Sequence, residues 1–298
     1  MIKGVSALEL LQRETTSTNR IKTLCKSLDK MLCGGIIIGK GIVELCGTPG
    51  SGKTLLCKIL ALNIQIPKSI GGPGMNAIYI DTEGSFSKNR LKEISKSTLS
   101  YINKKKLGSV TTDSLIENVK YMRVFDLEEL TNLLLSLPNI CKINSIGIII
   151  IDSISMLIRI CNINNQPYRL KMQQKIAKTL EKMSKEYSLS IIVTNHMTKK
   201  FTENDQKTRD NFLDSLKGKN LEPSLGLSWN SLICDRLILK SETSIISGNE
   251  AIHIIHVTNN IGETASFKVR FLLPLESIII SLQISPIGIQ DNNDANIT

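Results

Sequence analysis

The chain has 298 residues, of which 41% are apolar and 21% are charged. This apolar fraction is enough for a sizeable core and excludes a mostly disordered protein. The formal net charge is +10, which favours nucleic acid, a membrane surface or another acidic ligand as partner, although biased base usage is an equally good explanation. The sequence has no run of about 18 consecutive apolar residues, so we expect no membrane span.

The seven cysteines form no CxxC pair, and most of them stand in an apolar context. Free cysteines in such places behave as small apolar side chains. The pattern therefore favours a reducing compartment over a disulfide scaffold or a zinc ribbon.

Alternating apolar runs and helical patterns predict an α/β fold with a mostly parallel sheet. We expect strands at 42–46, 77–80, 119–124, 146–151 and 189–193. We expect helices at 53–63, 91–100, 127–137 and 170–187. The third helix is expected to end before Pro138. The run 146–151 is continuously apolar, as in a strand that is buried on both faces of a parallel sheet.

From about Arg236 the pattern changes to strands with short turns, which predicts an antiparallel extension of the sheet. These strands are expected at 237–239, 251–257, 266–271 and 278–284. No repeat and no Pro- or Gly-rich linker divides the chain. We therefore expect a lead-in segment over 1–20, one core domain over 21–290 and a disordered polar tail over 291–298.

A phosphate-binding motif lies between the first expected strand and the first expected helix. It is Gly47-Thr48-Pro49-Gly50-Ser51-Gly52-Lys53-Thr54, which fits GxxxxGK[ST]. The glycines let backbone N–H groups turn inward around phosphate oxygens, and the helix N-terminus adds positive partial charge. We expect Lys53 to reach the β- and γ-phosphates and Thr54 to ligate Mg²⁺. A Gly-rich turn without a ligand is the alternative, and the agreement of motif and context argues against it.

Polar side chains follow three of the expected strands. Asp152 ends the 146–151 run and is expected to support Mg²⁺ through water, or else to cap the next helix. Glu83 can polarise an attacking water; Asp81 is a rival for that role, and an uninvolved loop acid is a further alternative. His196 follows Thr194 and Asn195, and it either contacts the γ-phosphate or is a structural histidine.

The motifs occur in a fixed order: the P-loop, Asp-Thr-Glu-Gly over 81–84, an apolar strand ending in Asp-Ser over 152–153, and Thr-Asn over 194–195. In this order the sequence resembles the RecA-like recombinase family, and within it the eukaryotic recombinase paralogues, most of all their C-type subgroup. The similarity runs over about 7–271. Further matching runs are Ala7-Leu8-Glu9-Leu10-Leu11, Gln65-Ile66-Pro67 and Gly226-Leu227-Ser228-Trp229.

The resemblance implies a RecA-like P-loop ATPase core with ATP and Mg²⁺ bound between neighbouring subunits. It assigns phosphate and Mg²⁺ to Lys53 and Thr54, water activation to Glu83 and metal support to Asp152. Arg90 matches the position whose guanidinium packs on the adenine; a solvated helix residue is the alternative. The sensor position, usually Gln in the family, is His196 here, so the coupling of ATP to DNA is expected to differ. We expect the small helical N-terminal domain of the family to be missing.

Two stretches, 159–175 and 199–219, fall where the family places its DNA-binding loops. The first stretch contains basic groups that can neutralise phosphates and a tyrosine that can stack on a base; a solvated loop leading into a basic helix is the alternative. The second mixes basic and acidic residues, so its position and length are the better indication. The residues expected to contact DNA are Arg159, Tyr168, Arg169, Lys171, Lys199 and Lys200.

The resemblance implies a nuclear protein of homologous recombination and double-strand break repair. Such a protein helps the main recombinase to assemble on single-stranded DNA and processes branched DNA, in hetero-oligomers with sister paralogues. Two alternatives stay open: an assembly module that ATP orders with negligible hydrolysis, and a RecA-like signalling ATPase without DNA affinity. Turnover that depends on Glu83 would exclude the first alternative. Loss of DNA binding without the charges of Arg169 and Lys171 would exclude the second.

Overall fold

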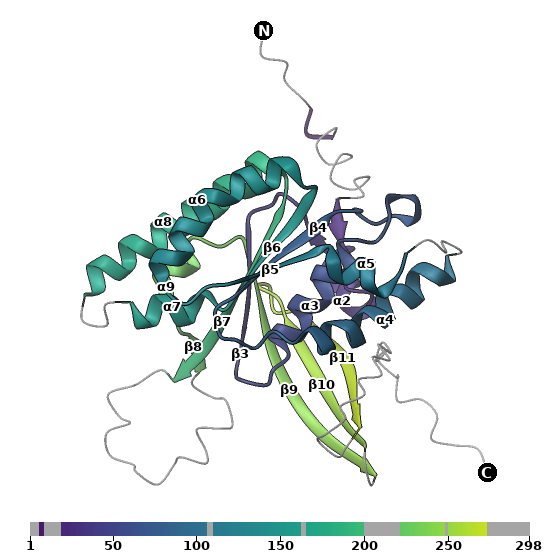
Figure 1. Cartoon of the computed structure of the whole chain (residues 1–298). Coiled ribbons are helices and arrows are strands. Elements are labelled where there is room, and N and C mark those ends of the chain that lie inside the picture. The colour runs from purple at the N-terminus through teal and green to yellow at the C-terminus, as the bar shows by residue number, and fades with distance from the viewer. Residues whose placement is uncertain are drawn as a thin grey trace, which may run out of the picture.

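The computed structural model describes residues 6–8, 19–105, 110–161, 165–199, 221–247 and 250–272 (Figure 1). Most of its strands belong to one mixed sheet. They are β3 (Ile42–Gly47), β4 (Asn76–Asp81), β5 (Val119–Arg123), β6 (Ile146–Asp152), β7 (Ser190–Lys199), β8 (Leu221–Pro223), β9 (Asp235–Ser247), β10 (Glu250–Thr258) and β11 (Thr264–Leu272). Their order is β11-β10-β9-β3-β7-β6-β4-β5, with β8 paired to β7. A separate small pair joins β1 (Arg20–Ile21) to β2 (Ile36–Ile37).

Six neighbouring strands of the sheet run parallel, so their carboxyl ends share one edge. In sheet order they are β9, β3, β7, β6, β4 and β5. Successive side chains of a strand point to opposite faces, and the central strands have an apolar core on both sides. Ile148 and Ile150 of β6 pack into the core that contains α3 (Lys53–Asn63). Ile149 and Ile151 pack into the core on the opposite face. This double burial explains why the β6 sequence is an unbroken apolar run.

Helices cover both faces of the sheet (Figure 1). The helices on the α3 side are α2 (Lys26–Met31), α4 (Lys88–Lys104) and α5 (Thr112–Glu117), with the short η1 (Lys68–Ile70) after α3. The opposite face is covered by α6 (Leu127–Ile143), α7 (Ile154–Ile160) and α8 (Gln166–Tyr187), with α9 (Gly226–Asn230) packed on α8. The prediction of a RecA-like α/β core with a mostly parallel sheet is therefore confirmed.

One predicted helix boundary is wrong. The sequence placed the end of the helix before Pro138, whereas α6 continues through Pro138 to Ile143. Proline removes one hydrogen bond of the helix ladder and disfavours helical backbone at the preceding residue. Ile140 and Cys141 pack against the core beyond the proline, and this burial offsets the loss.

The antiparallel extension is confirmed for β9, β10 and β11, which pair in antiparallel register. The first of them also pairs in parallel with β3, so this extension continues the parallel sheet directly. The expected strand 278–284 and the polar tail 291–298 lie outside the described residues. All seven cysteines are free. No helix in the described ranges has the length and apolarity needed to cross a membrane.

Candidate nucleotide-binding site

The P-loop connects the end of β3 to the start of α3 at the carboxyl edge of the sheet. Gly50 and Gly52 have φ angles of 77° and 94°, a left-handed backbone that glycine adopts without steric cost. The Lys53 ammonium donates hydrogen bonds to the Gly47 carbonyl at 2.8 Å and the Thr48 carbonyl at 3.0 Å. The Lys53 side chain thus extends back along the P-loop to the carbonyl groups at its start.

Lys53 is only 7% exposed. Burial lowers the pKa of its ammonium, and the nearby charges of Asp152 and Glu83 act in the opposite direction. Its two described acceptors are neutral carbonyls, so the charge has no directly bonded anion among the described residues. A buried ammonium in this state favours the arrival of an anionic ligand such as a phosphate.

Asp152 is held by three hydroxyl groups from three different elements. Its Oδ2 accepts hydrogen bonds from Thr54 Oγ1 at 2.8 Å and Tyr79 Oη at 2.7 Å, and its Oδ1 accepts one from Thr194 Oγ1 at 2.6 Å. The residue is 2% exposed, yet it forms no ion pair with any described residue. All its direct hydrogen-bond donors are therefore neutral, and the charges of Lys53 and Lys58 act on it only through space.

The residues of this site fit ATP and Mg²⁺. Mg²⁺ is commonly held by one or two carboxylates together with waters and the phosphates of the ligand, so a single buried carboxylate beside the Thr54 hydroxyl is suitable. The Ser51 hydroxyl is buried and has no hydrogen-bond partner in the described part of the chain. No group of three or more His, Cys, Asp or Glu side chains among the described residues forms an all-protein metal site.

Glu83 lies on the loop after β4 and is joined to two polar side chains. Its Oε1 accepts a hydrogen bond from Ser153 Oγ and lies 2.5 Å from His196 Nε2. The hydrogen bond with His196 holds the pKa of the Glu83 carboxyl below its ordinary value, although partial burial opposes the shift. His196 therefore contacts the acid expected to activate water.

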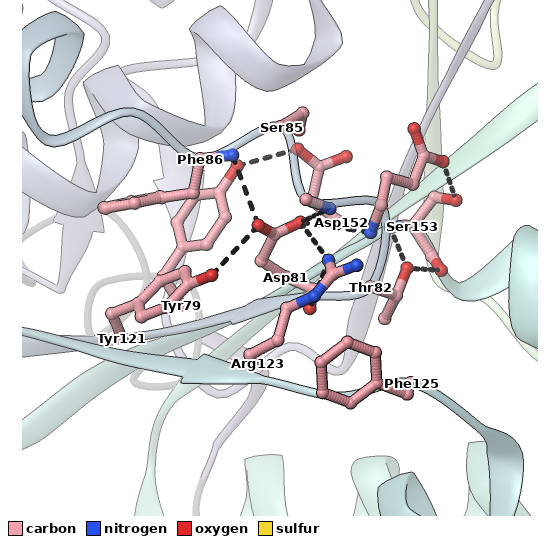
Figure 2. Close-up of polar contacts among 12 residues, drawn as sticks. Tyr79, Asp81, Thr82, Ser85, Phe86, Tyr121, Arg123, Phe125, Asp152 and Ser153 are labelled. Atoms are coloured by element: carbon pink, nitrogen blue, oxygen red, sulfur yellow. Dashed lines mark hydrogen bonds and ion pairs between the residues drawn. The ribbon is translucent and has the colours of Figure 1, made fainter.

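Asp81, the rival acid, is fully buried and differs from Glu83 in its partners (Figure 2). Its carboxylate accepts backbone N–H groups of the following loop and the Tyr121 hydroxyl at 3.2 Å, and it pairs with Arg123 at 3.2 Å. The backbone donors are Glu83 at 3.1 Å, Gly84 at 2.8 Å and Phe86 at 3.2 Å. Asp81 thus fixes the loop that carries Glu83, and its charge is already balanced by Arg123.

Three consecutive residues of β7 reach three different groups. Thr194 donates to Asp152, the amide of Asn195 donates to Glu44 Oε1 at 2.8 Å, and His196 contacts Glu83. The alternation of side chains along a strand accounts for the divergence of Asn195 from its two neighbours. The strand therefore links the Asp152 site, the central strand β3 and the Glu83 loop.

Sequence reasoning missed the partners that organise this edge. Glu44 is fully buried on β3 and pairs with Arg236 Nε at 2.5 Å. Tyr79 was read as an ordinary strand residue, although its hydroxyl bonds to Asp152. A signal was present for Glu44, because a charged residue inside a strand that is apolar on both faces requires a buried partner.

Arg90 lies in the first turn of α4, where its backbone N–H donates to the capping hydroxyl of Ser87 at 3.3 Å. Its expected contact with the adenine stays a prediction. The candidate His196 is placed beside Glu83, so a role in sensing phosphate would act through that pair.

The structure divides the expected DNA-binding residues into two places. Arg159 at the end of α7 and Arg169 on α8 line the same cleft, whose volume is about 120 Å³. Tyr168 lines a different groove of about 530 Å³ between α6, α7 and α8. Lys171 is exposed on α8. Most of the first stretch is therefore helix rather than loop, since α8 already begins at Gln166.

The second stretch begins where β7 ends, at Lys199, and Lys200 lies outside the described residues with the rest of it. The described residues on either side of this stretch belong to β7 and β8, which pair with each other. In the β7–β8 pair, the backbone of Thr198 lies opposite that of Glu222. The Ser224 hydroxyl, directly after β8, donates to Asn195 Oδ1 at 2.7 Å and so connects the chain that follows the stretch to β7.

The P-loop at the carboxyl edge of this mixed sheet defines a RecA-like nucleotide-binding core. A protein-family model described as Rad51 matches residues 13–216. The chain belongs to the Rad51 family.

Two curated relatives carry the name "DNA repair protein RAD51 homolog 3". The relative from Dictyostelium discoideum is 31% identical over 245 residues, which cover 79% of this chain and 61% of the relative. The relative from Cricetulus griseus is 32% identical over 252 residues, which cover 80% of this chain and 64% of the relative. The chain thus spans 61–64% of the length of these relatives. The chain is a eukaryotic-type RecA-like recombinase paralogue, as the sequence motifs predicted.

Proposed function

We propose that this chain is an ATP-dependent DNA-binding recombinase paralogue that acts in homologous recombination and double-strand break repair in the nucleus. The observation that carries the proposal is the Asp152 cluster, a buried carboxylate with only neutral hydroxyl donors beside a P-loop lysine. Such a carboxylate suits the Mg²⁺ shell of a bound nucleoside triphosphate. The repair role is supported by the names of both relatives.

Each residue of the site has a distinct part in this proposal. With a nucleotide bound, Lys53 would exchange the Gly47 and Thr48 carbonyls for phosphate oxygens, and Thr54 and Asp152 would hold the metal. Bound Mg²⁺ would neutralise charge that develops on the phosphates. Glu83 orients the attacking water, and its Oε2 is the oxygen left for that task, because the described hydrogen bonds go to Oε1.

Hydrolysis is expected to be slow. Glu83 is already hydrogen-bonded to Ser153 and His196, and its lowered pKa makes it a weaker base. The same contact favours a second candidate function, an assembly module in which ATP orders an interface and turnover is negligible.

DNA and partner chains complete the proposal. Strand β7 carries the contacts to Asp152 and Glu83 and ends at Lys199, where the second DNA-binding stretch begins, so a change at the nucleotide has a direct route to that stretch. Arg159 and Arg169 are proposed to bind phosphates of single-stranded DNA. The chain would assist assembly of the main recombinase on single-stranded DNA and the processing of branched DNA, in a hetero-oligomer with sister paralogues.

The test is single-stranded DNA binding by fluorescence anisotropy, with and without Mg²⁺ and ATP, across a salt series. Wild type and Glu83→Gln are expected to bind in a salt-sensitive manner when ATP is present, because Gln keeps the volume of the side chain and leaves Lys53 intact. Lys53→Ala is expected to lose both ATP binding and ATP-dependent DNA binding. Absence of DNA binding by all three proteins, with ATP binding intact in wild type, would contradict the proposal and favour the assembly module.

A further inference from the structure

Helix α8 carries a row of lysines on its outer face. The helix has 22 residues, and its exposed lysines recur at intervals of four and three residues. They are Lys171, Lys175, Lys178, Lys182 and Lys185, and we refer to them as the lysine stripe. With 3.6 residues per turn, these side chains fall within about 40° of a common direction. From Lys171 to Lys185, no other residue of α8 falls in that arc.

The lysine stripe lies opposite the buried face of α8. The buried residues of the helix are Gln173, Ile176, Ala177, Leu180, Met183 and Ser184. By helical geometry, these positions are centred about 180° from the stripe. The stripe therefore contributes nothing to the packing of α8 and presents its charges outward.

The fold gains little from this arrangement. Like charges spaced three or four residues apart repel each other on a helix. Lys182 pairs with Glu186 at 3.6 Å and Lys185 with Glu181 at 2.6 Å, both on the exposed surface. Lys171, Lys175 and Lys178 form no ion pair within the described part of the chain. An ordinary solvated helix face mixes both signs of charge, whereas the first half of this stripe is unbalanced.

We propose that the lysine stripe is a binding site for the phosphate backbone of double-stranded nucleic acid. From Lys171 to Lys185 the helix rises by about 21 Å, which matches the axial length of about six base pairs of a duplex strand. Lysine ammonium groups are point charges on flexible stems and contact phosphates without reading sequence. Such a row of charges can face the phosphates that both strands present along one side of a duplex.

The chemistry of the arc favours a duplex over a single strand. Proteins that bind single strands combine a basic groove with aromatic side chains on which bases stack. The stripe lies on the exposed outer face of α8 rather than in a groove, and none of its members is aromatic. Tyr168 is outside the arc and lines the groove against α6 and α7, whose edge it shares with one member of the stripe, Lys175.

Lys171 and Lys175 also fall in the first expected DNA-binding stretch, but the lysine stripe as a whole goes beyond the proposed function, because it needs neither the P-loop nor the cleft of Arg159 and Arg169. Lys53 lies on the other side of the sheet, at the start of α3, whereas α8 covers the face with α6 and α7 (Figure 1). Duplex binding through the stripe is therefore expected to be independent of ATP. The proposal of a duplex site can therefore fail while ATP-dependent binding of single strands is observed. Equally, the duplex site can be found while ATP-dependent binding of single strands is not.

The experiment measures binding of the full chain to a labelled 20-base-pair duplex without nucleotide, between 50 and 200 mM salt. The test variant replaces Lys175, Lys178 and Lys182 by Gln. The control replaces Lys88, Lys96 and Lys104, three exposed lysines of α4 on the other face of the sheet, also by Gln. Both variants lose three charges, and Gln has nearly the helix propensity of Lys, so circular dichroism is expected to match wild type.

The logarithm of the association constant falls linearly with the logarithm of the salt concentration, and loss of three phosphate contacts makes this slope shallower by about 2.7. Over the fourfold salt range, the wild type and the control are then expected to lose about 40-fold more affinity than the test variant, which starts out weaker. Addition of Mg²⁺ and ATP to the wild type is expected to leave its affinity for the duplex unchanged. Equal slopes for the two lysine variants would overturn the proposal. Stronger, stripe-dependent binding to phosphatidylserine vesicles than to the duplex would also overturn it and would indicate a membrane surface as the ligand.

Discussion

Asp81 and Asp152 lie opposite each other in the β4–β6 register, yet their carboxylates have different kinds of partner. Asp81 has a cation, Arg123, and three backbone N–H groups. Asp152 has three hydroxyl groups and no ion pair among the described residues. A buried acid that a direct ion pair has neutralised is structural, whereas one whose direct partners are all neutral is prepared for a ligand that brings a cation.

The comparison also explains the arrangement of the Glu83 loop. The Asp81 carboxylate accepts backbone N–H groups of that loop, including that of Glu83. Ser153, the neighbour of Asp152 in the chain, donates a hydrogen bond to the Glu83 side chain. The loop is therefore fixed by one acid, and the catalytic side chain that it carries is held toward the other. Each prediction below separates the two acids.

The largest effect is expected for Asp81→Asn. Removal of one partner from a buried ion pair leaves Arg123 uncompensated, and the free energy of unfolding is expected to fall by about 3–5 kcal/mol. For Asp152→Asn we expect a loss of about 1 kcal/mol, because hydroxyl groups can reverse their roles and the removal of a buried charge without a direct ion pair offsets the weaker hydrogen bonds. Urea denaturation without nucleotide measures both. Equal losses would refute the division between the acids.

Tyr79→Phe is expected to cost about 2 kcal/mol, because a buried hydroxyl donates to a charged acceptor at 2.7 Å. Tyr121→Phe is the matched change at Asp81, where the bond is longer at 3.2 Å, Tyr121 is 45% exposed and Arg123 remains. We expect its cost to be below about 1 kcal/mol in the same denaturation assay. A larger cost for Tyr121→Phe would mean that Asp81 depends on neutral donors as Asp152 does.

The smallest effect concerns Glu83 and His196. Because the folded-state pKa of Glu83 is lowered, its ionised form stabilises the fold above its unfolded pKa, and this contribution is lost as pH falls through the folded value. Both side chains are about a quarter exposed, so a double-mutant cycle with Glu83→Gln and His196→Ala is expected to give a coupling of about 0.5–1 kcal/mol near neutral pH. The coupling should be lost once the pH falls below the pKa of Glu83 in the folded state. A coupling that persists undiminished in that range would contradict this assignment.

Local signals in the sequence were sufficient for the P-loop, because the motif, the strand before it and the helix after it are contiguous. They were not sufficient to choose between Asp81 and Glu83. The choice depends on Arg123 and Tyr121, which are about forty residues away and are brought beside Asp81 by the β4–β5 register. The same limit applies to His196, whose partner lies more than a hundred residues earlier in the chain. Short helices such as α7 were missed because an apolar run of one or two turns has no clear period.

The central claim is that Asp152 serves a metal that arrives with the nucleotide, and the affinity for a non-hydrolysable ATP analogue tests it most directly. The measurement compares wild type and Asp152→Asn by calorimetric titration, in Mg²⁺ and in chelator. The account predicts that Mg²⁺ tightens binding to wild type by at least about tenfold, or 1.4 kcal/mol, and that this gain disappears in Asp152→Asn. An undiminished Mg²⁺ effect in a folded Asp152→Asn would contradict the account.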